Sequence, residues 1–134
     1  MEVKKQPGAA TNPESFYQSR PAWRVGIMEM VDPFGWHQIH GNKLTDLREK
    51  LGHFESMTWS EILIRDKRRN HFIPRKDICK AAQDRLVSMR QDDVDELVSL
   101  RLSGPERVWG ILDGDILRVV WWDPEHRVCP SIKD

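Results

Sequence analysis

A turn signal between two apolar runs constrains this chain more than any other feature. Residues 107–112 and 115–122 have the composition of strands, and Asp113-Gly114 between them suits the positive φ angles of a two-residue hairpin turn. Such a turn sets the register of the hairpin, and the register decides which side chains share a face. Together with the apolar run that begins at residue 97, the pattern predicts an antiparallel meander over residues 97–129.

The expected register, with Leu112 opposite Asp115, gives the meander two faces of different chemistry. One face collects mostly apolar residues, namely Val108, Gly110, Leu112, Leu117, Val119 and Trp121. The other face mixes cations with aromatic rings, namely Arg107, Trp109, Ile111, Ile116, Arg118, Val120 and Trp122. Arginines among tryptophans suit an anionic, planar or phosphorylated partner. The competing interpretation is a solvated face whose arginines lie over exposed rings.

Three helices are expected before the meander. Apolar residues at helical spacing predict a helix over residues 43–51, and the capping box formed by Thr58 and Glu61 predicts a second helix over residues 59–65. A third helix opens after Pro74 and should cover the apolar face of the meander. Its apolar stripe consists of Ile78, Ala82, Leu86 and Met89. This order predicts a two-layer α+β fold, with helices packed on one face of a small antiparallel meander sheet.

The length of 134 residues fits a single domain, which we expect over residues 16–134, after a mobile polar tail over residues 1–15. Residues 16–41 are irregular, with one strand-like piece near residues 23–28. Because no apolar run reaches about 18 residues and no signal peptide is evident, we expect a soluble, cytoplasmic protein without membrane contact. Two cysteines, at positions 79 and 129, are too few for a disulfide framework and are expected as buried, unbridged thiols.

Charge is balanced overall, with 21 basic and 21 acidic residues, so net charge gives no argument for a polyanionic partner. Its distribution is uneven, because residues 65–76 are strongly basic and residues 92–96 are strongly acidic. The basic segment is a candidate RNA-binding loop, and a solvated connection is the alternative. Its candidate RNA-binding residues are Arg65, Lys67, Arg68, Arg69 and His71.

Several residues could cleave RNA without a metal ion. That reaction needs a group that takes the 2′-OH proton, a cation that stabilises the phosphorane, and a group that protonates the leaving 5′ oxygen. His71, Arg101, Arg107 and the pair Glu125-His126 are candidates for these roles. They come from separate segments, so only the fold can bring them together.

His126 follows Asp123-Pro124, a turn that could direct its ring across the sheet toward Arg107 and Arg118. The alternative is that the ring forms its hydrogen bonds within the turn.

A metal site is a third possibility, because His37 and His40 form a single HxxH pair to which His53, Cys79 or Cys129 could be added. No second close pair of ligands accompanies it, so no metal is expected. Motifs for nucleotide hydrolysis, dinucleotides or serine catalysis are absent, and we expect no cofactor.

Over about residues 75–130, the series LRLSG, ERVWGI, a DG turn, DILRVVWW and DPEH resembles the compact RelE and YoeB type of toxin, small bacterial mRNA interferases. The resemblance implies a RelE-like helix-plus-sheet core acting on RNA, including ribosome-bound mRNA, and an antitoxin partner. It implies Glu96 or Glu106 as the acidic residue, Arg107 and Arg118 as phosphate-stabilising residues, and His126 as the terminal acid. The segments TWSEI, HFIP, AQDRL and WWDPEHRVCPS are also similar to those of a family of short bacterial proteins to which no activity is assigned.

Two functions follow as expectations. The first is a toxin-like, metal-independent endoribonuclease or RNA-binding protein of a bacterial toxin-antitoxin type, in which Arg101, Trp109 and Trp122 join the basic loop in binding RNA. The second is a non-catalytic protein-interaction module that uses the tryptophans and arginines of the sheet, since Trp and Arg are enriched at binding hot spots.

Overall fold

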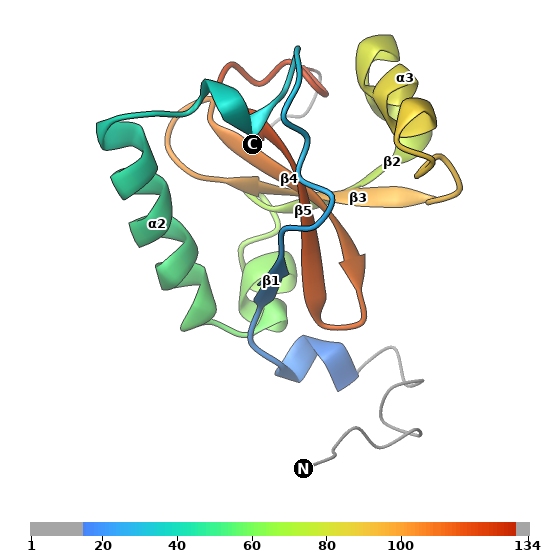
Figure 1. The fold of residues 1–134 in the computed structure, drawn as a ribbon. Coiled ribbons are helices and arrows are strands. Elements are labelled where there is room, and N and C mark those ends of the chain that lie inside the picture. Colours follow the sequence, from blue (N-terminus) through green and yellow to red (C-terminus); the bar gives the residue numbers. More distant parts are fainter. Residues whose placement is uncertain (1–14, 131–134) are drawn as a thin grey trace.

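A computed structural model describes residues 15–130 (Figure 1). The tail expected over residues 1–15 lies outside these residues, apart from Ser15. The strands are β1 (Ala22–Arg24), β2 (His71–Pro74), β3 (Glu96–Arg101), β4 (Arg107–Asp113) and β5 (Ile116–Asp123). The helices are α2 (Asn42–Glu55) and α3 (Lys80–Ser88), and the short turns of helix are η1 (Ser15–Gln18), η2 (Trp36–Gln38), η3 (Glu61–Arg65) and η4 (Arg75–Asp77).

The expected α+β class is confirmed. All strands form one sheet in the order β1-β5-β4-β3-β2, in which β2 to β5 are antiparallel neighbours and β1 adds a parallel strand beside β5. The sheet is therefore mixed, because the irregular N-terminal region supplies an edge strand that the meander pattern could not predict. Within residues 15–130, no helix has the length and apolar composition needed to span a membrane.

The helices form where the sequence predicts them, with shifted ends. α2 continues past Gly52, whose surroundings are open, and ends where the hydroxyl of Ser56 donates to the backbone oxygen of His53 at 2.6 Å. The capping box is present, since the Thr58 amide donates to Glu61 Oε1 at 2.9 Å and the Glu61 amide to Thr58 Oγ1 at 3.2 Å. The helix that it starts widens into the π-helical turn η3.

α3 begins later than Pro74 suggested. The chain turns through η4 and is then extended at Ile78 and Cys79, where the Cys79 amide donates to the backbone oxygen of Val128 at 2.7 Å. The predicted stripe is confirmed: Ile78, Ala82 and Leu86 are buried and Met89 packs beside them.

The hairpin register differs from the expected one. The turn residues are Gly114 and Asp115, so that Asp113 pairs with Ile116. Of the two turn residues, only Gly114 has a positive φ, which fits the turn that takes glycine at its first central position. As a result, Arg118 lies opposite Ile111, not opposite Trp109.

A β-bulge in β5 changes the two faces further. Trp109 pairs with Trp121 and Gly110 with Val119, which leaves Val120 without a partner in β4. The Val120 carbonyl instead accepts hydrogen bonds from the Glu29 amide at 3.0 Å and from Trp36 Nε1 at 3.2 Å. The extra residue exchanges the faces of the two following side chains, so that Trp121 lies on the Trp109 face and Trp122 beside Val108.

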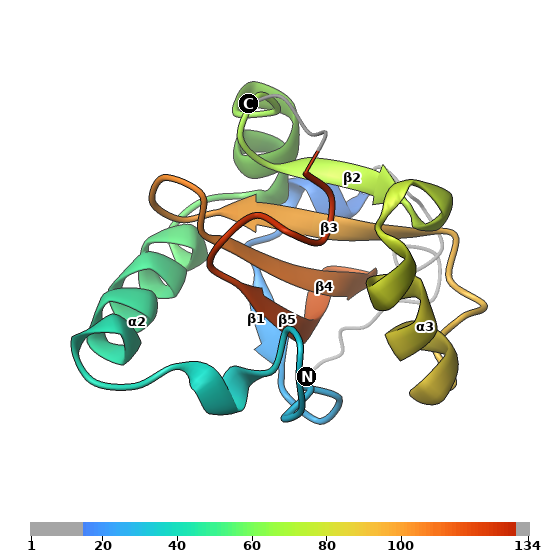
Figure 2. The same ribbon diagram turned by 90° about the horizontal axis from the view of Figure 1, so that it is seen from above.

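Both faces of the sheet carry an apolar cluster, and α2 and α3 lie on opposite sides of it in Figure 2. α3 packs on the face that holds Trp109, Ile111 and Trp121. The prediction that α3 covers the Val108 face is wrong, because α2, η2 and η3 supply the residues that pack there. The face expected to be charged and open is therefore largely core.

Candidate functional site

Cationic side chains gather at one end of the sheet. β2 begins at His71, β3 ends at Arg101, β4 begins at Arg107 and β5 ends at Asp123, so antiparallel pairing brings these residues to the same end. Arg107 lies between Arg101 and Asp123 as their direct partner, which places the three side chains on one face. We call His71, Arg101, Arg107 and His126 the histidine-arginine cluster.

Asp123 fixes the turn that carries His126 into this cluster. Its carboxylate is fully buried and accepts hydrogen bonds from Trp109 Nε1 at 3.1 Å and from the backbone amides of Arg127 and Val128 at 2.8 and 3.0 Å. His126 lies inside this loop with φ of 59°, a left-handed conformation that is uncommon for residues other than glycine. Backbone of this kind often occurs at functional sites.

The charges within the cluster affect the pKa values of its two histidines. Burial is the main cause that lowers the pKa of His126 from 6.5, and the positive charges of Arg107, Arg101 and His71 lower it further, against the opposing effect of Asp123. Burial, followed by the charge of Arg107, also lowers the pKa of His71. Both imidazoles are thus favoured in their neutral form beside two guanidinium groups.

Buried polar atoms without a hydrogen-bond partner among residues 15–130 lie near this end. They include Nε2 of His126, Oγ of Ser99 and Oε1 of Glu106. Ser99 pairs with His71 on one side and Trp109 on the other, and it shares their face. Buried polar atoms are nearly always hydrogen-bonded in native proteins, so unsatisfied atoms beside these cations are an uncommon feature of this end of the sheet.

A basic pocket adjoins the cluster. It has a volume of about 510 Å³ and is lined by Arg65, Asp66, Arg68, Arg69 and Arg101. We call it the arginine pocket. Buried Asn70 holds its loop against the sheet, because Asn70 Nδ2 donates to the backbone oxygen of Ile62 at 3.2 Å and Asn70 Oδ1 accepts from the amide of Arg101 at 3.0 Å.

The structure thus brings together a large part of the predicted site. His71, Arg101, Arg107 and His126 form the cluster, and three further arginines of the basic loop line the pocket. Lys67 is exposed in the same loop but does not line the pocket.

Three candidates lie elsewhere. Arg118 is five residues from Asp123 along β5, about 16 Å away at the usual rise of a strand, because the hairpin turn lies at the other end of the sheet. Glu96 is exposed at the far end of β3, where it pairs with Pro74. The carboxylate of Glu106 is turned to the start of α2, where Oε2 forms an ion pair with Lys43 Nζ. The acidic role that the toxin resemblance implied for Glu96 or Glu106 therefore has no place within the cluster.

The aromatic part of the expected site is wrong in this structure. Trp109 is 0% exposed and donates its indole proton to Asp123, and Trp122 is 3% exposed and packs against Trp36. The bulge and the packing of helices on both faces bury these rings, so they cannot stack on bases or present a protein-binding face.

Sequence reasoning missed Asn70 and Ser99. It identified Asp123 as part of the turn before His126, because aspartate before proline is a frequent start of a side-chain-to-backbone turn, but not as the acceptor for Trp109. Asn70 and Ser99 carried no signal, since their roles depend on which strands become neighbours.

No group of three or more His, Cys, Asp or Glu side chains that could hold a metal ion occurs within residues 15–130. Of the HxxH pair, His37 instead lies 3.3 Å from the carboxylate of Asp32. Cys79 and Cys129 form no disulfide, and Cys129 Sγ donates to the backbone oxygen of Asp77 at 3.3 Å.

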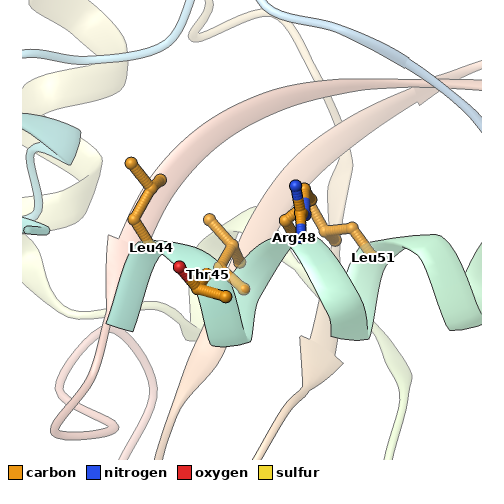
Figure 3. A pocket seen from close by; sticks show the side chains of 5 residues that line it. Leu44, Thr45, Arg48 and Leu51 are labelled. Carbon is orange, nitrogen blue, oxygen red and sulfur yellow. The ribbon is translucent and has the colours of Figure 1, made fainter. Parts of the chain in front are cut away.

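A second hollow, of about 440 Å³, lies along α2 (Figure 3). Its lining is mainly apolar and contains none of the candidate residues; it consists of Leu44, Thr45, Leu47, Arg48 and Leu51. The histidine-arginine cluster and the arginine pocket therefore remain the candidate site.

Comparison with protein-family models, with curated proteins and with solved structures gave no significant match. The resemblance to the RelE and YoeB type of toxin accordingly stays a prediction.

Proposed function

We propose that this protein binds RNA and cleaves it without a metal ion at the histidine-arginine cluster. The observation that supports this best is the convergence of His71, Arg101, Arg107 and His126 from four separate segments at one end of the sheet. RNA cleavage by its own 2′-OH requires groups that exchange protons and a cation that stabilises the phosphate. The two imidazoles can exchange protons, and the partly exposed guanidinium of Arg101 can hold a phosphate. Arg107 is 2% exposed and donates to the backbone oxygens of Gly104 and Glu106, so it acts on the phosphate through its charge.

In the proposed reaction, neutral His71 takes the proton of the 2′-OH, and the 2′ oxygen forms a bond to phosphorus. Arg101 and Arg107 stabilise the added negative charge of the phosphorane. The bond from phosphorus to the 5′ oxygen then breaks, and His126 supplies the proton to that oxygen. The products are a 2′,3′-cyclic phosphate and a 5′-OH end.

Two properties of the site fit these roles. His71 hydrogen-bonds to the backbone of Arg68, and in its neutral form an imidazole can accept a proton at the ring nitrogen that carries no hydrogen. His126 can become the acid when RNA binds, since a phosphate anion offsets the nearby arginine charges that disfavour its protonated form.

Cleavage of a short RNA in the presence of a metal chelator tests the proposal. The wild type should cleave the RNA to cyclic phosphate ends and should leave the same sequence intact when every 2′ oxygen is methylated. His71→Asn and His126→Asn should each lower the rate at least about a hundredfold, the usual contribution of a general acid or base. His40→Asn, which alters an exposed histidine outside the cluster, should have no effect.

Undiminished cleavage by both cluster variants, or cleavage of the methylated RNA, would overturn the catalytic assignment. Binding without cleavage by the wild type would leave an RNA-binding protein in place of an enzyme.

The same proposal includes a toxin-like role in the bacterial cytoplasm and an antitoxin segment that covers the cluster. Its support is the resemblance over about residues 75–130, together with a cationic cluster that an acidic segment could cover. Induced expression in bacteria should arrest growth with the wild type and not with His126→Asn. Normal growth alongside active purified protein would remove the toxin role and keep the nuclease.

A further inference from the structure

We infer that the arginine pocket is a second phosphate subsite, which binds the phosphate next to the one held by the histidine-arginine cluster. This inference builds on the proposed function and names its substrate class, namely RNA with a phosphate on each side of a nucleoside, in preference to a substrate with one phosphodiester.

The shape and charge of the pocket support an anionic occupant. Four arginines and one carboxylate line about 510 Å³. Guanidinium groups present several donors in a planar fork that matches phosphate oxygens. Arg65 has local acidic partners, with Nη1 3.4 Å from Glu61 Oε2 and Nε 3.7 Å from Asp66 Oδ1. Within residues 15–130, no ion pair joins Arg68 or Arg69 to an acid, so these two are the main candidates for phosphate contact.

The position of the pocket indicates which phosphate it would hold. Arg101 is both a wall of the pocket and a member of the cluster whose charge affects His126. The Asn70 hydrogen bond to the Arg101 amide fixes the loop against the end of β3. A nucleic acid strand seated on the cluster therefore passes directly to the pocket, where its next phosphate meets Arg68 and Arg69.

The loop offers a matched control for general charge attraction. Lys67 lies between pocket residues in the chain and is exposed, but it does not line the pocket. Lys67→Ala removes the same charge from the same loop as Arg68→Ala or Arg69→Ala. Long-range attraction predicts equal effects of these single variants, whereas a subsite predicts a larger effect of each arginine variant, and the largest effect when both arginines are replaced together as the arginine pair.

The first experiment measures binding of an uncleavable 2′-O-methyl RNA by fluorescence anisotropy over a range of salt concentrations. The arginine pair should weaken binding at least about tenfold. It should reduce the slope of log affinity against log salt by about 0.7, the value for one phosphate contact on a single strand. Asp66→Asn should tighten binding, since it removes the negative charge from the pocket wall. Equal losses in the single arginine and lysine variants would overturn the subsite.

The second experiment measures cleavage of a dinucleotide with one phosphodiester and of the same dinucleotide carrying an added 5′ or 3′ phosphate. In the wild type, the added phosphate at one of the two ends should lower KM about tenfold, whereas in the arginine pair the plain and the phosphorylated dinucleotide should have the same KM. No gain from a phosphate at either end would overturn the subsite while the nuclease stands. Absence of cleavage, with arginine-specific loss of binding, would overturn the nuclease while the subsite stands.

Discussion

Replacement of His126 by asparagine should separate the chemistry of the site from the stability of the fold. His126 has φ of 59° and a buried Nε2 atom without a partner among residues 15–130. The left-handed conformation costs an ordinary residue about 1–2 kcal/mol and an unsatisfied buried polar atom about 1–3 kcal/mol. Asparagine tolerates this backbone better but loses the burial of the ring, about 1–2 kcal/mol. We therefore expect the free energy of unfolding near pH 7 to stay within about 1 kcal/mol of the wild type.

The difference in the free energy of unfolding between His126→Asn and the wild type should shift in favour of the variant as the pH falls. Because the folded pKa of His126 is lowered from 6.5, the unfolded chain binds protons first, and the wild type loses stability as the pH falls below that value. His126→Asn lacks this contribution, although His71 titrates in the same direction in both proteins. Urea denaturation near pH 7 and near pH 5 measures the change. A variant that loses about 3 kcal/mol or more near pH 7, or loses more stability than the wild type on acidification, would refute the reasoning.

Three other variants test the packing around the site. Gly110→Ala should lower the free energy of unfolding by about 2 kcal/mol or more, because its new Cβ would lie 2.7 Å from a backbone oxygen and a leucine side chain of β5. A change below about 0.5 kcal/mol in urea denaturation would contradict the register between β4 and β5. Ser99→Ala should be neutral or slightly stabilising without RNA, since a buried hydroxyl without a partner is removed, and a loss above about 1 kcal/mol would reveal a partner. Glu29→Ala should destabilise the fold by about 3 kcal/mol, because it leaves Arg85 and the Trp121 indole without their acceptor. An unchanged melting temperature in thermal unfolding would show that this contact is unimportant.

Local patterns in the sequence were sufficient to predict much of the fold. The capping box at Thr58 depends on residues within about one helical turn, and the stripe of α3 on residues within about three turns. Both are present in the structure. The meander also follows from alternation and a turn signal. In each case, the interacting groups are close in the chain, so the pattern contains the information that it predicts.

Long-range contacts account for the errors. The bulge at Val120 is stabilised by donors from Glu29 and Trp36, more than 80 residues earlier, and no local pattern indicates it. One extra residue was enough to exchange the faces of Trp121 and Trp122. The expected open face of tryptophans and arginines was lost for this reason, together with the Trp-based interaction surface.

The sequence predicts several residues of the candidate site, but it does not predict how they are arranged in space. His71, Arg101, Arg107 and His126 were identified by chemical type, and antiparallel pairing of the strand ends brings them together. Arg118 was assigned to the same site because it shares the strand, but it lies too far along β5. Two residues of a sheet share a site only when they lie on the same face, at the same end of the sheet and close together along their strands.

An NMR titration of the ring protons of His71 and His126, with and without an uncleavable 2′-O-methyl RNA, tests whether RNA binds at the histidine-arginine cluster. We expect both pKa values to lie below 6.5 in the protein alone and to rise when RNA binds, because the phosphate offsets the charge of Arg107. In Arg107→Ala both pKa values should already be higher in the protein alone, because the charge of Arg107 is removed, and the control variant His40→Asn should behave as the wild type. Titration of both rings unchanged by bound RNA would contradict the assignment of this cluster as the site where RNA binds.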